Sequence, residues 1–312
     1  MKQTPIWFPG TMHLAALMLC GCIPTQPASH PDLVWGQRGH APGRFDRPRA
    51  AVIDDRDLLY IVDKTGRIQV FDAEGKFQRV WSTPETENGL PCGLAIDRDG
   101  NLLVADTHYF RVLTYTSEGQ LLPDKTIGGE QGQGPGQFNF VTDVAVDSRG
   151  DYYVAEYGQC DRVQKISRSG RFVLQWGGHG SEPGQFIQPR CLLMDGNDHL
   201  WVADACNHRI QEFDVSSEPP RLVQFWGTQG TQRGELRYPY GLAFDGEGGI
   251  CVCEFGNSRV QKFTLAGQFL AEWGRPGRGP GELNQPWSVA RDSRGRYHVL
   301  DTYNHRVQRF RL

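Results

Sequence analysis

Asp204-Ala205-Cys206-Asn207-His208-Arg209-Ile210-Gln211 is the stretch that decides the fold, because near-copies of it recur along the chain. It returns near the end of the sequence as Asp301-Thr302-Tyr303-Asn304-His305-Arg306-Val307-Gln308. In both copies an acid and an arginine flank a short turn, and a β-type run begins at the arginine. Self-similarity of this kind is the sequence signature of a repeat architecture.

Six copies of the repeat share three landmarks. A short apolar run ends in an aspartate at Asp54, Asp97, Asp147, Asp195, Asp245 and Asp292. A second acid follows nine residues later, at Asp63, Asp106, Glu156, Asp204, Glu254 and Asp301, and an arginine closes the turn at Arg67, Arg111, Arg162, Arg209, Arg259 and Arg306. Because the acid and the arginine recur in every copy, we predict structural pairs rather than catalytic dyads.

Each copy reads as four short β-strands separated by turn residues, which predicts a small antiparallel meander. One meander cannot bury both of its faces, so the copies must stack, and repeats of this length fit the blades of a β-propeller. The first strand carries mostly small residues where an innermost strand has least room, at Ala50, Gly93, Asp143, Cys191, Gly241 and Ser288.

The two ends of the chain complete one another. The last copy stops at Phe310 after its third strand, and Leu33-Val34-Trp35-Gly36 has the form of the missing fourth strand. We therefore predict an all-β, six-bladed β-propeller of four-stranded antiparallel blades over residues 32–312, with its last blade closed by the N-terminal strand. The predicted blades cover about 45–81, 91–127, 138–176, 186–226, 236–273, and 283–310 together with 32–36.

The repeat and its linkers, such as Gly134-Pro135-Gly136-Gln137-Phe138 and Pro183-Gly184-Gln185-Phe186, resemble NHL repeats over roughly residues 31–312. This resemblance implies the propeller fold. It does not imply one function, since NHL propellers include protein- and RNA-binding platforms, sensor ectodomains and one type of lyase.

The N-terminal segment Leu19-Cys20-Gly21-Cys22 resembles the lipobox of bacterial lipoproteins. We predict a signal peptide over residues 1–21, a lipidated Cys22, and a tether over residues 22–31. The protein would then be exported and held by acylated Cys22 at the bilayer of a bacterial cell envelope, at the outer membrane in a Gram-negative cell. A plain cleaved signal is the alternative.

Metal chemistry is not favoured by the residues at the predicted axis. The resembling amidating lyases hold zinc with histidines at positions that here carry Arg49, Cys92, Thr142, Arg190, Tyr240 and Trp287. A calcium site needs several oxygen ligands, and Asp143 is the one acid among the small inner-strand positions. We predict no metal and no cofactor, and interpret Asp143 as a lone polar group bonded to a neighbouring blade.

The cysteines predict little chemistry. Cys251 and Cys253 alternate on one strand and are expected to pack as small hydrophobic residues. In an oxidising compartment a disulfide between Cys191 and Cys206 is one alternative. The sequence does not determine which cysteines pair.

Strand direction gathers a set of aromatic and basic residues on one face of the ring. The candidate ligand-binding residues are Arg49, Arg190, Tyr240 and Trp287 at the inner-strand entries, and His108, Tyr157, Phe255 and Tyr303 at the turns. Aromatic and arginine side chains are typical of surfaces that bind a ligand or partner, because they offer large contact areas and bidentate polar contacts. We predict a cell-envelope binding or scaffold protein for a protein, peptide or saccharide. The alternative is an envelope lyase or hydrolase at the same mouth, and the missing zinc histidines lean against an enzyme. The net charge of −3 argues against nucleic acid.

Overall fold

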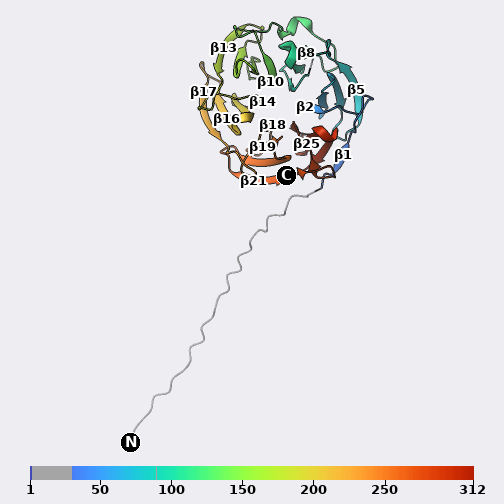
Figure 1. The fold of residues 1–312 in the computed structure, drawn as a ribbon, viewed down its shortest axis with the longest axis vertical. Helices are drawn as coiled ribbons and strands as arrows, with labels where there is room; N and C mark the ends of the chain where they lie inside the picture. Colours follow the sequence, from blue (N-terminus) through green and yellow to red (C-terminus); the bar gives the residue numbers. More distant parts are fainter. Residues whose placement is uncertain (2–29, 89) are drawn as a thin grey trace.

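A computed structural model describes Met1, residues 30–88 and residues 90–312, and these residues form a closed ring of six four-stranded antiparallel sheets (Figure 1). The fold prediction is therefore confirmed. The predicted signal peptide, Cys22 and most of the tether lie outside the described residues. Among the described residues, no helix has the length and apolar character needed to cross a bilayer.

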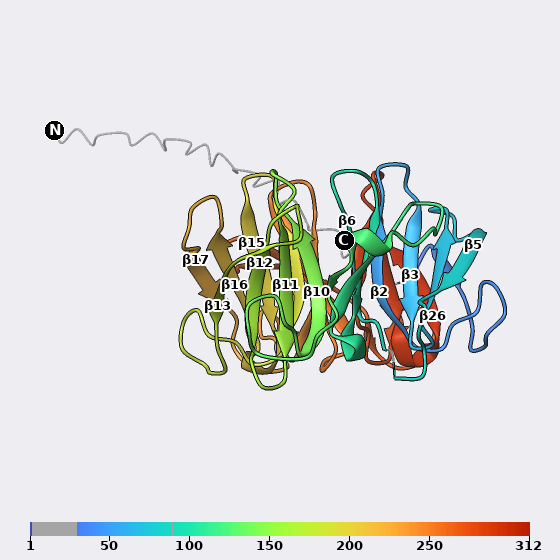
Figure 2. The ribbon, with the colours of Figure 1, turned by 90° about the horizontal axis from the view of Figure 1, so that it is seen from above.

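Five blades are continuous in sequence, and we number the blades in chain order. Each runs from its innermost strand outward, and the strands extend between the two faces of the disc (Figure 2). The strands are β2 to β5 (Pro48–Ile53, Leu59–Asp63, Arg67–Phe71, Phe77–Ser82), β6 to β9 (Gly93–Ile96, Leu102–Asp106, Arg111–Tyr115, Ile127–Gly128), β10 to β13 (Phe140–Val146, Tyr152–Tyr157, Arg162–Ile166, Phe172–Gly177), β14 to β17 (Pro189–Met194, His199–Asp204, Arg209–Asp214, Arg221–Trp226) and β18 to β21 (Pro239–Phe244, Gly249–Glu254, Arg259–Thr264, Phe269–Trp273).

The sixth blade joins the two ends of the chain. It contains β24 (Val289–Arg291), β25 (Tyr297–Asp301), β26 (Arg306–Phe310) and β1 (Leu33–Trp35). Strand β1 pairs antiparallel with β26, with Leu33 opposite Arg309 and Trp35 opposite Val307. The Arg309 Nε also donates to Asp32 at 2.7 Å. This pairing leaves no open blade, so the ring has no break at which it could splay.

All six acid–arginine pairs form within their blades, with N···O distances of 2.5 to 2.9 Å. In blade 4, Arg209 bonds Asp204 and also donates to the carbonyls of Glu182 and Gln185 in the preceding linker. The pair thus fixes each blade to the chain that enters it. The predicted structural role is confirmed.

The inner strands approach one another closely around the axis. A Cβ at Gly93 of β6 would lie 2.5 Å from the carbonyl oxygen of Thr142 on β10, and a Cβ at Gly241 would lie 2.9 Å from the Cα of Ser288. Only glycine permits these approaches. Apolar clusters between adjacent blades form the core, and Cys251 and Cys253 are fully buried in one of them, as predicted.

Candidate functional site

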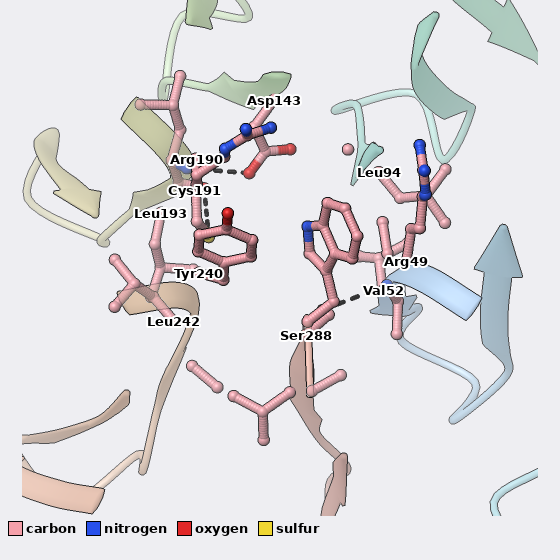
Figure 3. A pocket seen from close by; sticks show the side chains of 18 of the residues that line it. Arg49, Val52, Leu94, Asp143, Arg190, Cys191, Leu193, Tyr240, Leu242 and Ser288 are labelled. Carbon is pink, nitrogen blue, oxygen red and sulfur yellow. Dashed lines mark hydrogen bonds between the residues drawn. The ribbon is translucent and has the colours of Figure 1, made fainter. Parts of the chain in front are cut away.

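The inner strands enclose a cavity of about 240 Å³ on the ring axis (Figure 3). Every blade contributes to its wall, because the first strand of each blade faces the axis. Polar lining side chains are those of Arg49, Cys92, Asp143, Arg190, Cys191, Tyr240, Trp287, Ser288 and Arg291, and apolar ones include Val52, Leu94, Leu193 and Leu242. The site is therefore a polar pocket continued by apolar walls, a common form of small-molecule site.

Arg49 and Arg190 line this cavity without an ion pair to a carboxylate among the described residues. Arg49 donates from Nη1 to the carbonyl of Leu90 at 3.2 Å, and Arg190 donates from Nη2 to Gln188 Oε1 at 3.1 Å. The Nε of each arginine is buried without a partner. Burial lowers the pKa of Arg49 and nearby Arg190 lowers it further, but a guanidinium stays charged in proteins. Arg291 also lines the cavity and forms no ion pair among the described residues, so the lining carries three positive charges that no carboxylate pairs.

Aromatic rings hold these guanidiniums in place. The Arg190 guanidinium carbon lies 4.7 Å from the ring centre of Tyr157 and 5.2 Å from that of Tyr240, and Arg49 lies 4.8 Å from that of Trp287. Stacking of this kind uses the face of a guanidinium and leaves its N–H edges for planar, bidentate contact with a carboxylate or phosphate. In Figure 3, Arg49 lies across the cavity from Arg190 and Tyr240.

The structure brings together most of the residues predicted for ligand binding. Arg49, Arg190, Tyr240 and Trp287 line the cavity itself. Phe255 stacks on Tyr240 at 4.7 Å between ring centres and continues the aromatic wall towards Tyr303, whose ring centre is 6.4 Å away. Tyr303 lies at the rim, 37% exposed.

His108 is placed differently. Its ring packs against Phe140 at 5.3 Å, its Nδ1 lies 2.7 Å from the carbonyl oxygen of Asn88, and it does not line the cavity. It contacts the site only indirectly, because Phe140 in turn packs against Tyr157. The repeat pattern gave no indication that the His108 side chain would contact a backbone carbonyl outside the pocket.

Asp143 has a larger part in the pocket than the sequence indicated. Its Oδ2 accepts the N–H of Leu192 at 2.9 Å, so the predicted bond to a neighbouring blade is confirmed. Its Oδ1, however, has no partner among the described residues, and the side chain lines the cavity with only 6% exposure. Burial raises the pKa of Asp143 to about 7. The signal in the sequence was its status as the one acid among the six small inner-strand positions.

Two thiols, those of Cys92 and Cys191, line the cavity. Burial raises the pKa of Cys92 and of Cys191, so both remain protonated at neutral pH. Cys191 and Cys206 are not bridged, and all six cysteines of the described residues are free thiols. The disulfide that the sequence left open is therefore not formed in this structure.

Zinc of the lyase type does not fit this site. The corresponding positions carry no imidazole, and two of them carry the guanidiniums of Arg49 and Arg190, which repel a divalent cation. No group of three or more potential ligand residues capable of holding a metal occurs in the part of the chain that the structure describes.

The six blades form a propeller with a partly polar cavity on its axis. The family model of the SMP-30/Gluconolactonase/LRE-like region (SGL) matches residues 138–282, and that of the NHL repeat matches residues 283–310. Together with the six blades, these matches support placing the chain in the NHL/SGL propeller family.

Several similar proteins are enzymes by name. Peptidylglycine alpha-amidating monooxygenase of Rattus norvegicus is 40% identical over 41% of this chain and 14% of the rat protein. Peptidyl-alpha-hydroxyglycine alpha-amidating lyase 1 of Drosophila melanogaster is 34% identical over 58% of this chain and 34% of the fly protein. A streptogramin B lyase structure has a TM-score of 0.61 at 10% identity, covering 89% of this chain and 96% of that one, which shows likeness of fold.

The chain thus matches well under half the length of these curated relatives. The matches nonetheless favour an enzyme over the binding or scaffold protein that the sequence alone suggested, because the names of these relatives describe catalysis.

Proposed function

We propose that the protein is a lyase- or hydrolase-type propeller enzyme whose axial cavity binds a small carboxylate substrate through Arg49 and Arg190. One observation carries this proposal: the partly buried guanidiniums of Arg49 and Arg190, each with a buried and unpartnered Nε, line one cavity without an acidic partner. Uncompensated buried charge is costly, and an anionic ligand would offset that cost. The names of the relatives support catalysis at such a site.

The side chains of the cavity have separate roles in binding the carboxylate. Arg49 and Arg190 bind the carboxylate, and Tyr157, Tyr240 and Trp287 fix the guanidiniums and exclude water from the walls. A cavity of about 240 Å³ accepts a small molecule or the end of a longer chain. Because the donor set does not fit zinc, the chemistry differs from that of the resembling zinc-dependent lyases.

We further propose that this activity is located at a bacterial cell envelope, with the propeller held by acylated Cys22. The lipobox-like residues before Cys22 support this location. Metabolic labelling with a clickable fatty acid tests it: wild-type protein incorporates the label and Cys22→Ser does not.

Binding is tested first, by calorimetry on the full chain with hippurate, an acylated glycine carboxylate, and with hippuramide, its uncharged analogue. The proposal expects hippurate to bind at least about tenfold more tightly, since a bidentate arginine–carboxylate contact contributes about 1.5–3 kcal/mol. Arg190→Gln removes this preference, with the melting temperature as the check on folding. Equal affinity for the two compounds contradicts the site.

Turnover is tested with α-hydroxyhippurate, the simplest relative of the substrate in the fly protein's name. Lyase cleavage breaks its N–Cα bond and gives benzamide and glyoxylate, with the hydroxyl proton transferred to nitrogen. Hydrolase activity is assayed separately with benzoylated lactones and esters that carry a carboxylate. Carboxylate binding without turnover of either class favours the binding protein instead, the function indicated by the absent histidines.

A further inference from the structure

The axial cavity runs along the inner strands from the mouth towards the opposite face of the ring. In β2 its wall extends from Arg49, which lies at the mouth, to Ile53 at the far end of the strand. A strand rises about 3.3 Å per residue, so these two residues are separated by about 13 Å. Arg291 is the last residue of β24 and precedes Asp292 as Ile53 precedes Asp54, so it lines the cavity at this far end.

Arg291 departs from the repeat. The residue before the first aspartate of each copy is apolar in the other five blades, where it is Ile53, Ile96, Val146, Met194 or Phe244. A requirement of the blade itself would not select an arginine at one of six equivalent positions. The charge at Arg291 therefore calls for an explanation other than folding.

The guanidinium of Arg291 lies at the far opening of the cavity. A Cβ at Gly246 would lie 2.9 Å from its Nη1, and a Cβ at Gly295 would lie 3.2 Å from its Nη2. These glycines belong to the loops that join the first two strands of blades 5 and 6 on the opposite face. Arg291 also lines a separate hollow of about 360 Å³ at that face, so it lies where the cavity and the hollow meet.

The acids beside Arg291 are paired with other cations. Asp245 forms an ion pair with Lys262 at 2.9 Å, and Asp292 forms one with Arg296 at 2.7 Å. Glu247, the other acidic side chain of the hollow, is exposed and makes no ion pair with Arg291 among the described residues. Arg291 thus offers its N–H groups to an anion in the cavity.

Between the two charged ends the wall is largely apolar (Figure 3). Its aliphatic side chains include those of Val52, Leu94, Leu193 and Leu242. The carboxyl and the hydroxyl in this stretch are used in links between blades: Asp143 accepts the N–H of Leu192 at 2.9 Å. Ser288 accepts the N–H of Ala51 at 3.3 Å. An apolar chain therefore suits the middle of the cavity better than a polar one.

We propose that the axial cavity takes an extended dianion, with one carboxylate at Arg49 and Arg190, a second anionic group at Arg291, and an apolar chain between them. This inference rests on the proposed function, since it needs a carboxylate at the mouth. It narrows the substrate class to a carboxylate that carries a distal anionic group. An α,ω-dicarboxylate of about ten carbons, with bonds of about 1.5 Å, has roughly the length required.

The test compares sebacate, the dicarboxylate of ten carbons, with decanoate, which has the same chain and one carboxylate, by calorimetry on the full chain near neutral pH. Wild-type protein is expected to bind sebacate about tenfold or more tightly, because decanoate leaves Arg291 without an anion and places a methyl group beside it. In a series from glutarate to dodecanedioate, affinity is expected to be highest near sebacate.

Two variants of Arg291 remove the second anion site. Arg291→Gln is expected to bring the affinities for sebacate and decanoate to within about twofold of one another. Arg291→Met places there the residue type that blade 4 carries as Met194, so it suits the blade if the Gln variant folds poorly, and it has the same expected result. Hippurate binding and the melting temperature show that the mouth and the fold are intact in both variants.

Arg294→Gln is the matched control. Arg294 is 65% exposed and lines the hollow of the opposite face but not the cavity, so this variant is expected to keep the wild-type preference for sebacate. If Arg294→Gln removed the preference as fully as Arg291→Gln, the second anionic group would lie in the outer hollow and the proposed dianion site would be wrong.

The remaining outcomes separate this inference from the proposed function. If wild-type protein binds hippurate but binds sebacate no more tightly than decanoate, or if Arg291→Met keeps the preference, the second anion site is refuted while the carboxylate site at the mouth stands. If neither hippurate nor sebacate binds, the site at the mouth fails and the dianion site fails with it.

Discussion

Replacing Asp143 by Asn should change how the stability of the free protein depends on pH. The carboxyl has a pKa of about 3.9 in an unfolded chain and of about 7 in the folded one, where burial raises it. Between these values the unfolded chain releases a proton and the folded chain does not. Wild-type protein thus loses stability as pH rises from about 4 to about 7, and the loss is complete above the folded pKa.

The magnitude follows from the two pKa values. Each tenfold change in an equilibrium constant is worth about 1.4 kcal/mol, so the interval from about 3.9 to about 7 corresponds to about 4 kcal/mol. The Asn variant has no such loss. The free energy of unfolding of the Asn variant, measured relative to that of wild type, should therefore increase by about 4 kcal/mol between pH 4 and pH 7.5.

Urea denaturation of both proteins at half-unit pH intervals measures this difference without any ligand. A constant offset between the two curves of unfolding free energy against pH is expected from altered packing at the Asn side chain. Such an offset does not test the pKa of Asp143. Parallel curves over the whole range would refute the reasoning, because they would mean that Asp143 ionises in the folded protein as readily as in the unfolded chain.

Three further changes test the frame of the ring by chemical denaturation. Asp204→Asn leaves Arg209, 8% exposed, without its buried partner and should cost about 3–5 kcal/mol; a loss under about 1 kcal/mol would contradict a structural role for the pair. Gly93→Ala places a Cβ 2.5 Å from the Thr142 carbonyl and should cost about 1–3 kcal/mol, whereas Gly196→Ala, with no atom within 4 Å, should be nearly neutral. Trp35→Ala removes the aromatic contact of β1 with Phe71, ring centres 6.4 Å apart, and should cost about 3 kcal/mol; an equal effect of Val34→Ala, 38% exposed, would argue against closure by packing.

The fold was predictable because its determinants are local and repeated. Asp204 and Arg209 are close in sequence, and their pairing in one blade implies the same pairing in the others. The closure was predictable for a related reason. A propeller blade needs four strands, so a copy that ends after three at Phe310 requires the strand around Val34 from the other end.

The site was predictable only in part. Strand direction places Arg190 and Tyr240 at the same mouth, and the structure confirms that both line the cavity. The state of Asp143 was hidden, because it depends on which atoms of the two neighbouring blades come near its oxygens. The N–H of Leu192 lies 49 residues away in sequence and serves one oxygen, and Gly93 offers the other nothing.

The balance of charge in the cavity links the site to its choice of ligand. Arg49, Arg190 and Arg291 contribute positive charges to the lining, and Asp143 contributes none when it is protonated and one negative charge when it is ionised. The net charge of the lining thus falls by one as pH rises through about 7. A monoanion loses attraction in that change. The same side chain that links blade 3 to blade 4 therefore sets the charge of the cavity, and this coupling arises because the link is made by a carboxyl rather than by a hydroxyl of the kind that Ser288 supplies.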